Sequence, residues 1–439
     1  MPPRSLRSLL ALLACGLAVP LALDAAPRTP ISPLLVGNNV WYHSPNAKVW
    51  ELTREAGVRL LRIGGAGYDH HLPKDDTLVA WVRQIRGIGA EPLLQVSQYG
   101  GPEKAAALVA LFNQRRAAGE PIRYWSIGNE PWLQNGRPDF ATLAPAVADY
   151  FKKISAAMKA VDPTIKIFGP DECDLFEEFH EKLFGPELDL GARVPGKPYH
   201  YIDGLAWHRY PQTETEPGLA EIEEFRVRSR YARQIVDRVN QRHARTGDQA
   251  LVWALTEFNA KGGPQVHTWG NGQMFGAIYG IAMEHGAFTA ATWSMYEHGG
   301  SRTGTDFSFV DGKQLTPRPT YWHMQLVSRY FSGDYIPARS PADSLVVYGA
   351  DDGKRIAVML LNLSDREVAF ALGFGGRPSV ERDAVPVVLD SRPGPTRAGR
   401  IGPRSTQVLL FESGTVSRID YTEQDFLAGR GPSSPSPVD

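Results

Sequence analysis

The chain has 439 residues, more than a single hydrophobic core usually holds, which indicates one large domain and a smaller one. Hydrophobic residues make up 43% and charged residues 22% of the sequence, as in globular proteins, so extensive disorder is excluded. The net charge is -1 at pH 7, and without an excess of Lys and Arg neither nucleic acid nor an anionic membrane is expected as a partner.

Residues 1–26 have the layout of an export signal. Arg4 and Arg7 precede an apolar run at 9–23, which Pro20 interrupts and which is too short to span a bilayer comfortably. We therefore expect an exported protein, which would be periplasmic, an outer-membrane lipoprotein or secreted.

Two cleavage routes fit this segment. Residues 12–16, Leu-Leu-Ala-Cys-Gly, resemble a bacterial lipoprotein box, in which Cys15 would carry a lipid anchor, and cleavage near residues 25–26 by an ordinary signal peptidase is the alternative. The sequence has two cysteines, and with Cys15 in the signal only Cys173 remains. A disulfide framework and a cysteine-based metal site are therefore excluded.

Eight short apolar runs follow, separated by longer stretches with helical spacing. The runs lie at 34–37, 58–64, 92–96, 124–127, 165–169, 202–207, 251–255 and 288–293. Near-continuous apolar strands that alternate with helices predict a parallel sheet covered by helices. Eight such units favour a (β/α)8 TIM barrel over 30–332, and a Rossmann sheet is disfavoured because no glycine fingerprint follows the first strand.

The pattern changes in the last quarter of the chain. Short apolar runs at 345–348, 356–362, 368–372, 385–389 and 407–411 are spaced as in hairpins. We predict a small antiparallel β-sandwich domain over 335–415. Because 431–437 are rich in Pro and Ser, we expect residues 416–439 to form a disordered tail.

Two glutamates carry the strongest chemical signal. Glu130 follows the fourth apolar run, lies between two tryptophans and precedes Pro131, a setting that desolvates a carboxylate and raises its pKa toward that of a general acid. Glu257 ends the seventh run in a similar context. Since catalytic groups of a barrel lie where strands end, both should meet at one mouth. Paired carboxylates beside a scissile bond are what glycoside hydrolysis requires.

The segments Ile-Gly-Asn-Glu-Pro at 127–131 and Thr-Glu-Phe-Asn at 256–259 resemble those of clan A glycoside hydrolases, retaining enzymes built on (β/α)8 barrels. This resemblance implies that Glu130 is the acid/base and Glu257 the nucleophile. It also implies that Asn129 hydrogen-bonds the 2-hydroxyl of the sugar.

Further motifs extend the resemblance over the barrel. Arg62, in Arg-Ile-Gly-Gly, is similar to an arginine that orients the nucleophile, and His208 and Tyr210 lie in a His-Arg-Tyr-Pro segment similar to that of several member families. Trp293 matches an indole that forms the floor beneath the cleaved sugar. Families 39, 44, 51 and 79 are all similar, and the motifs do not settle on one.

Other aromatic and acidic side chains are secondary candidates. Trp132 is a candidate sugar platform. Four other aromatic residues share that possibility: Trp41, Tyr99, Trp269 and Tyr296. Three more carboxylates follow predicted strands: Asp171, Glu172 and Glu297.

The function expected from the sequence is hydrolysis of β-linked sugars or a polysaccharide by double displacement, with endo action favoured because loop aromatics are spread along the chain. We expect no cofactor, no metal and no obligate protein partner. Two alternatives stay open: a non-catalytic carbohydrate-binding protein on the same barrel, and a transglycosylase. A zinc hydrolase is disfavoured because no HExxH-type ligand set is present.

Overall fold

The computed structural model describes residues 28–41, 46–301, 304–376, 378, 383–391 and 396–438. The predicted signal at 1–26, with Cys15, lies outside these residues. Within the described ranges, none of the helices combines the length and apolar composition that a membrane crossing requires.

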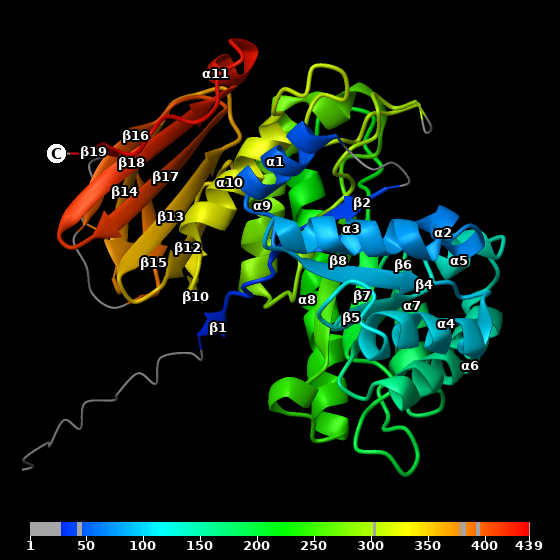
Figure 1. Ribbon diagram of the computed structural model, residues 1–439. Coiled ribbons are helices and arrows are strands. Elements are labelled where there is room, and N and C mark those ends of the chain that lie inside the picture. The colour runs from blue at the N-terminus through cyan, green and yellow to red at the C-terminus, as the bar shows by residue number, and fades with distance from the viewer. Residues whose placement is uncertain are drawn as a thin grey trace, which may run out of the picture.

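Eight parallel strands close into a barrel, as predicted (Figure 1). They are β2 (Val36–Val40), β3 (Leu60–Ile63), β4 (Glu91–Val96), β5 (Tyr124–Ile127), β6 (Lys166–Glu172), β7 (Gly204–Arg209), β8 (Val252–Phe258) and β9 (Ala290–Thr292). Pairing of β9 with β2, which sets Val36 opposite Ala290, closes the ring.

The alternation of side chains along these strands decides what fills the barrel. A buried apolar layer inside it includes Leu60, Leu93 and Ala206. Because strand side chains repeat on one face every second residue, the next inward positions are Arg62, Gln95 and His208. The barrel therefore has an apolar layer with a polar layer above it, toward the carboxyl ends of the strands.

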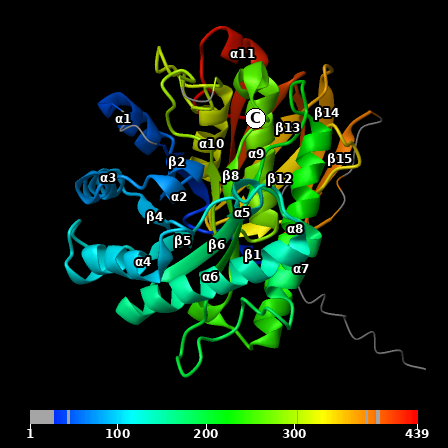
Figure 2. The same cartoon turned by 90° about the vertical axis from the view of Figure 1, so that its right-hand side faces the viewer.

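Helices after each barrel strand cover its outside (Figure 2). They are α1 (Ala47–Glu55), α2 (Ala66–His70), α3 (Asp75–Gly87), α4 (Gly101–Val109) with η1 (Ala110–Gln114), α5 (Pro131–Gln134), α6 (Phe140–Val161), α7 (Glu177–Phe184), α8 (Leu219–Arg242), η2 (Gly247–Gln249), η3 (Gly263–His267), α9 (Trp269–Glu284) and α10 (Pro319–Tyr330).

The C-terminal domain is a sandwich of two sheets. The larger has the order β1 (Thr29–Pro30), β10 (Asp334–Ile336), β12 (Leu345–Asp351), β13 (Arg355–Asn362), β17 (Ser405–Glu412), β18 (Thr415–Thr422) and β19 (Ser436–Pro437). The smaller has the order β11 (Ala338–Arg339), β15 (Val385–Leu389), β14 (Val368–Phe374) and β16 (Arg397–Ile401). The sheets are antiparallel as expected, except that β14 and β15 run parallel.

The sandwich packs tightly on the barrel through α9, whose residues from Trp269 to Met283 are all buried. Tyr348 of β12 lies directly against Gly280 of α9, where there is no room for a Cβ atom. A helix that is buried on every side must face protein on every side. The barrel and the sandwich therefore share this helix as one core element.

The predicted disordered tail at 416–439 is wrong for the part that the structure describes. β18 pairs with β17 along its whole length, and α11 (Glu423–Leu427) follows it. Ile419 and Tyr421 are buried, and the Tyr421 ring lies 4.7 Å from that of Trp269. The Pro- and Ser-rich end dominated the prediction, although two buried residues at strand spacing marked a further strand.

Replacement of Ile419 by Ala tests whether this strand belongs to the folded core. The side chain is 1% exposed, so its loss should lower the free energy of unfolding by about 2–4 kcal/mol. Leu427→Ala is the matched control, because Leu427 is 76% exposed and its truncation should change stability by less than about 0.5 kcal/mol. Urea unfolding of both variants measures this, and equal stabilities would contradict the assignment.

Candidate active site

The guanidinium of Arg62 lies at the centre of the polar layer. It is completely buried and donates to five oxygen atoms: Glu257 Oε1 at 2.7 Å, Asn129 Oδ1 at 2.7 Å, Asn39 Oδ1 at 3.0 Å, Gln95 Oε1 at 3.2 Å and Asp171 Oδ2 at 3.4 Å. Burial by itself would lower the pKa of Arg62, but the charges of Asp171 and Glu257 outweigh it and raise the pKa. The side chain is therefore a fixed positive charge.

Two glycines make room for this arrangement. A Cβ on Gly64 would stand 2.7 Å from the guanidinium carbon of Arg62. A Cβ on Gly65 would stand 2.7 Å from the Trp41 ring and 2.8 Å from the Trp293 ring, and Gly65 has a φ of 123°, which favours glycine. The Arg-Ile-Gly-Gly segment therefore fits both the buried cation and the aromatic wall next to it.

Glu257 accepts hydrogen bonds at both carboxylate oxygens. Oε1 receives Arg62, and Oε2 receives the hydroxyl of Tyr210 at 2.9 Å. A shift of register between β7 and β8 sets His208 opposite Glu257, and such bulges re-aim side chains near active sites. Burial raises the pKa of Glu257, His208 and Arg62 oppose the rise, and Glu130 adds to it.

Glu130 lies where β5 turns into α5. Its backbone is left-handed, with φ 45° and ψ 56°, and its N–H donates to the carbonyl of Asp171 at 2.8 Å. Burial raises the pKa of its carboxyl to about 7, with Arg62 opposing the rise and Asp171 adding to it. The side chain is 17% exposed, so a ligand at the mouth can reach it.

His208 lies between the two glutamates. Its Nδ1 atom is 3.0 Å from Glu130 Oε1 and 3.6 Å from Glu257 Oε2. Burial lowers the pKa of His208, and the charges of Glu257 and Asp171 oppose the fall. The predicted pair of carboxylates and three predicted partners, Arg62, His208 and Tyr210, thus form one contact network.

A buried carboxylate supports this network and was not identified from the sequence. Asp69 accepts from the N–H of Asn129 at 3.0 Å, from Gln95 Nε2 at 3.1 Å and from Gln98 Nε2 at 2.7 Å. Burial raises its pKa to about 6, and these hydrogen bonds oppose the rise. Asp69 therefore holds the backbone of Asn129 and the amide that contacts Arg62.

The predicted aromatic residues differ in where they lie: Trp293 and Trp41 are at the mouth of the barrel, whereas Trp132 is away from the network. Trp293 lies at the mouth, 4.8 Å from Trp41 between ring centroids, and donates through Nε1 to Glu297 at 2.7 Å. Trp132 packs edge-on against Phe176 at 4.9 Å and has the Arg137 guanidinium over its ring at 5.4 Å, so it lies outside the network.

Two other secondary candidates have structural contacts. Trp269 is 1% exposed within α9 and cannot serve as a platform. Glu172 accepts from the N–H of Trp132 at 3.0 Å and so holds the first turn of α5. Its carboxyl has a pKa raised by burial to about 7.

Glu130, His208 and Glu257 could in principle hold a cation, because one ligand atom from each lies within 4.8 Å of the others. However, the Arg62 guanidinium already contacts Glu257, and a second cation beside it would be repelled. The donor set is therefore better suited to protons than to a metal ion.

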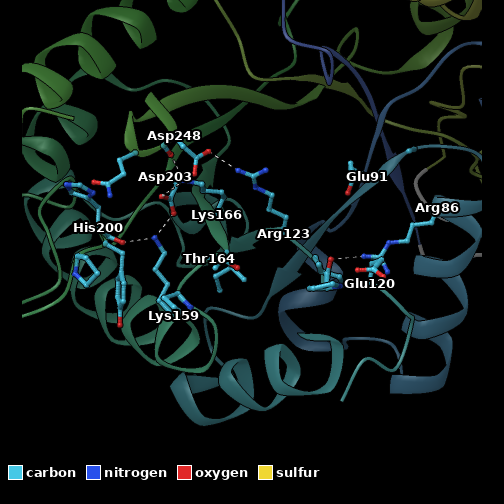
Figure 3. Close-up of a pocket in the computed structure, with 18 of the residues that line it drawn as sticks. Arg86, Glu91, Glu120, Arg123, Lys159, Thr164, Lys166, His200, Asp203 and Asp248 are labelled. Atoms are coloured by element: carbon cyan, nitrogen blue, oxygen red, sulfur yellow. Dashed lines mark hydrogen bonds and ion pairs between the residues drawn. The ribbon is translucent and has the colours of Figure 1, made fainter. Parts of the chain in front are cut away.

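A cavity of about 900 Å³ lies at the opposite end of the barrel, among the residues that precede β4 to β8 (Figure 3). Several of its charged side chains are paired with one another. Lys159 donates to Asp203 at 2.6 Å, and Arg123 donates to Asp248 at 2.8 Å. Because residues at this end of such barrels usually serve stability, we assign these pairs to the fold.

No protein-family model and no curated protein sequence matches the chain. Solved structures do match. A family 51 α-L-arabinofuranosidase from Thermotoga petrophila is 16% identical with a TM-score of 0.63, and the match covers 88% of this chain and 98% of that one. CelM2, a bifunctional glucanase-xylanase from a metagenome library, is 13% identical with a TM-score of 0.60, over 88% and 97%.

A family 30 endoxylanase from Clostridium papyrosolvens is 12% identical with a TM-score of 0.59, and the match covers 88% of this chain and 98% of that one. Each match spans both the barrel and the sandwich. At such low identities the likeness concerns the fold, and the fold that the sequence predicted by resemblance is confirmed.

The raised pKa of Glu130 predicts how Glu130→Gln changes stability with pH. The folded pKa near 7 exceeds the ordinary value of 4.5, so the folded state keeps a proton that the unfolded state releases between these pH values. Glu130 therefore contributes stability at low pH that is lost as the pH rises to 7. Relative to wild type, Glu130→Gln should gain about 1–3 kcal/mol between pH 5 and pH 8.

Urea unfolding of both proteins at the two pH values measures this gain. Glu103→Gln removes an exposed carboxyl and serves as the control, for which we expect the same difference from wild type at both pH values. A pH-independent difference for Glu130→Gln would contradict the raised pKa.

Proposed function

We propose that this protein is a retaining glycoside hydrolase with Glu257 as nucleophile and Glu130 as acid/base. The observation that carries the proposal is the spacing of the two carboxyls, which have oxygen atoms within 4.8 Å of each other. Retaining enzymes hold the carboxyl groups about 5–5.5 Å apart, whereas inverting enzymes separate them by about 6.5–9.5 Å to leave room for a water molecule. An approach of one oxygen from each group to within 4.8 Å supports the shorter separation.

In the first step an oxygen of Glu257 attacks the anomeric carbon, and the bond from that carbon to the leaving oxygen breaks. Glu130 transfers its proton to the leaving oxygen, which departs as an alcohol. Arg62 and Tyr210 hold the Glu257 carboxylate at both oxygens, which restricts its rotation and favours its ionised form. The product of this step is a covalent glycosyl-enzyme.

In the second step a water molecule attacks the anomeric carbon, and Glu130, now ionised, takes the proton from that water. The bond between the sugar and Glu257 breaks, which restores the carboxylate and leaves the sugar with its original configuration. A group that acts first as acid and then as base needs a pKa near the working pH. The pKa of Glu130, raised to about 7, supports this double role.

Asn129 and Trp293 are proposed to bind the sugar at the cleavage point. The Asn129 side-chain oxygen faces Arg62, so its NH₂ group is the end of the amide left to donate to a 2-hydroxyl. Trp293, fixed by its hydrogen bond to Glu297, presents an indole at the mouth on which a sugar ring can stack. We keep Trp132 as a more distant contact.

The activities named for the matched structures guide the choice of sugar. The matched proteins are an α-L-arabinofuranosidase, a glucanase-xylanase and an endoxylanase, which suggests a pentose- or glucose-containing polysaccharide as the substrate of this enzyme. Arg4 and Arg7, followed by the apolar run at 9–23, support export, so we propose that the enzyme acts outside the cytoplasm, with or without a lipid at Cys15.

Substrate turnover tests the proposal. The panel comprises nitrophenyl β-xyloside, β-glucoside and α-L-arabinofuranoside, with xylotriose and cellotriose, each assayed with and without EDTA. Wild type should hydrolyse at least one, and Glu257→Gln should lower kcat by about 10⁴-fold or more while it still shows a cooperative unfolding transition. NMR of the first product should show retained configuration.

Each other outcome has a defined meaning. Inverted product would refute Glu257 as nucleophile, and products longer than the substrate would indicate transglycosylation. Sugar binding without turnover would indicate a binding protein, and turnover that EDTA abolishes would indicate a metal.

The pH dependence of kcat/KM tests the role of Glu130 separately. Because the acid must be protonated when substrate binds, kcat/KM should fall on the alkaline side with an apparent pKa near 7. With a dinitrophenyl leaving group, which needs no protonation, Glu130→Gln should retain measurable kcat/KM and lose that alkaline limb. An unchanged limb in the variant would assign the titration to another group.

A further inference from the structure

Tyr99 is an exposed aromatic side chain at the catalytic end of the barrel. Four large apolar side chains in the described ranges are exposed: Tyr99 at 47%, Leu133 at 37%, Val227 at 59% and Leu427 at 76%. Val227 lies on α8 and Leu427 on α11, whereas Tyr99 follows β4 and Leu133 lies in α5. Single exposed apolar residues are ordinary, so Tyr99 needs further evidence.

That evidence begins with the way the Tyr99 ring is held. It stacks on the His70 ring at 5.2 Å with an interplanar angle of 22°. The Tyr99 N–H donates to Ser97 Oγ at 3.1 Å, and that hydroxyl donates to the Asp69 carbonyl at 2.6 Å. One face of the ring is thus backed and its loop is fixed, so little conformational freedom remains to be lost when a ligand binds.

The stacked rings of Tyr99 and His70, which we call the platform, connect directly to the segment that carries Glu130. A ring nitrogen of His70 lies 3.1 Å from Gln134 Oε1, and Gln134 ends the short helix that Glu130 begins. The Asp69 carboxylate, next to His70 in the chain, holds the N–H of Asn129. His70 and Tyr99 therefore lie on the Glu130 side of the mouth.

Strand order places this side opposite the nucleophile. In the closed ring from β2 to β9, β4 lies four strands from β8 in either direction, so the end of β4 faces the end of β8 across the mouth. In a displacement at the anomeric carbon, the leaving group departs on the face opposite the attacking Glu257. The leaving group therefore moves toward the rim that carries Tyr99.

A hollow next to the platform has room for a ligand. It has a volume of about 580 Å³, and it is lined by Tyr68, His70 and Tyr99, by the charged Asp75 and Lys104, and by further residues of α4. Small-molecule sites commonly measure about 300–1,000 Å³ and combine aromatic walls with a few polar groups. A sugar ring with its hydroxyl groups has this chemistry.

We propose that Tyr99, backed by His70, is the stacking platform of a subsite for a sugar on the leaving-group side of Glu130. The inference rests on the proposed function and deepens it, because it assigns the substrate class. The enzyme cleaves between sugar residues of a chain, and a small aglycone leaves this platform unused.

Paired substrates test this subsite. For each glycone, kcat/KM is measured on the trisaccharide (xylotriose or cellotriose) and on the matching nitrophenyl glycoside, and the ratio of the two is taken. Tyr99→Ala should lower that ratio by about tenfold or more, and Tyr99→Phe, which keeps the ring, by less than about twofold. Leu427→Ala, at the remote exposed position, should leave it unchanged.

The outcomes separate this inference from the proposed function. If wild type hydrolyses these substrates and Tyr99→Ala changes both kcat/KM values equally, or neither, the subsite is refuted and the glycosidase remains. Turnover of the nitrophenyl glycosides alone would also refute it. If wild type hydrolyses nothing, the proposed function fails and the inference with it. Unfolding midpoints of the variants exclude misfolding as a cause.

Discussion

The polar interior of the barrel depends on the buried charge of Arg62. A guanidinium without water must be surrounded by acceptors, and Glu257, Asn129, Asn39, Gln95 and Asp171 supply them from different strands. Each acceptor is thereby fixed in place by the same cation. The need to satisfy one charge thus organises the carboxylate, the amide and the supporting layer into a single geometry.

The two glutamates occupy unequal environments around this charge. Glu257 contacts Arg62 directly and has both oxygens occupied, whereas Glu130 is hydrogen-bonded to His208 and has some exposure. Burial acts on both, but only Glu257 receives the cation at hydrogen-bond distance. Different roles for chemically identical side chains follow from these surroundings.

Much of the fold could be predicted, because periodicity is a local property of sequence. The eight apolar runs correspond to the eight barrel strands, and Glu130 and Glu257 stood out because each stands just past the end of such a run. Asn39, Gln95 and Asp69 were missed since their importance depends on what the closed barrel brings beside them. A polar residue within a buried strand, such as Gln95, was the available signal. The strand around Ile419 was missed because a polar, proline-rich end masked a short alternation.

The paired glycines after Arg62 and Ile63 give the motif a meaning in terms of space. Gly64 leaves room for the cation inside the barrel, and Gly65 leaves room for the rings of Trp41 and Trp293 at its mouth. The four residues therefore leave two spaces, one occupied by Arg62 of the same segment and the other by Trp41 and Trp293 from elsewhere in the chain. A related sequence that changed either glycine would also have to change the side chain that occupies its space. Variation at these positions is thus expected to be correlated across the chain.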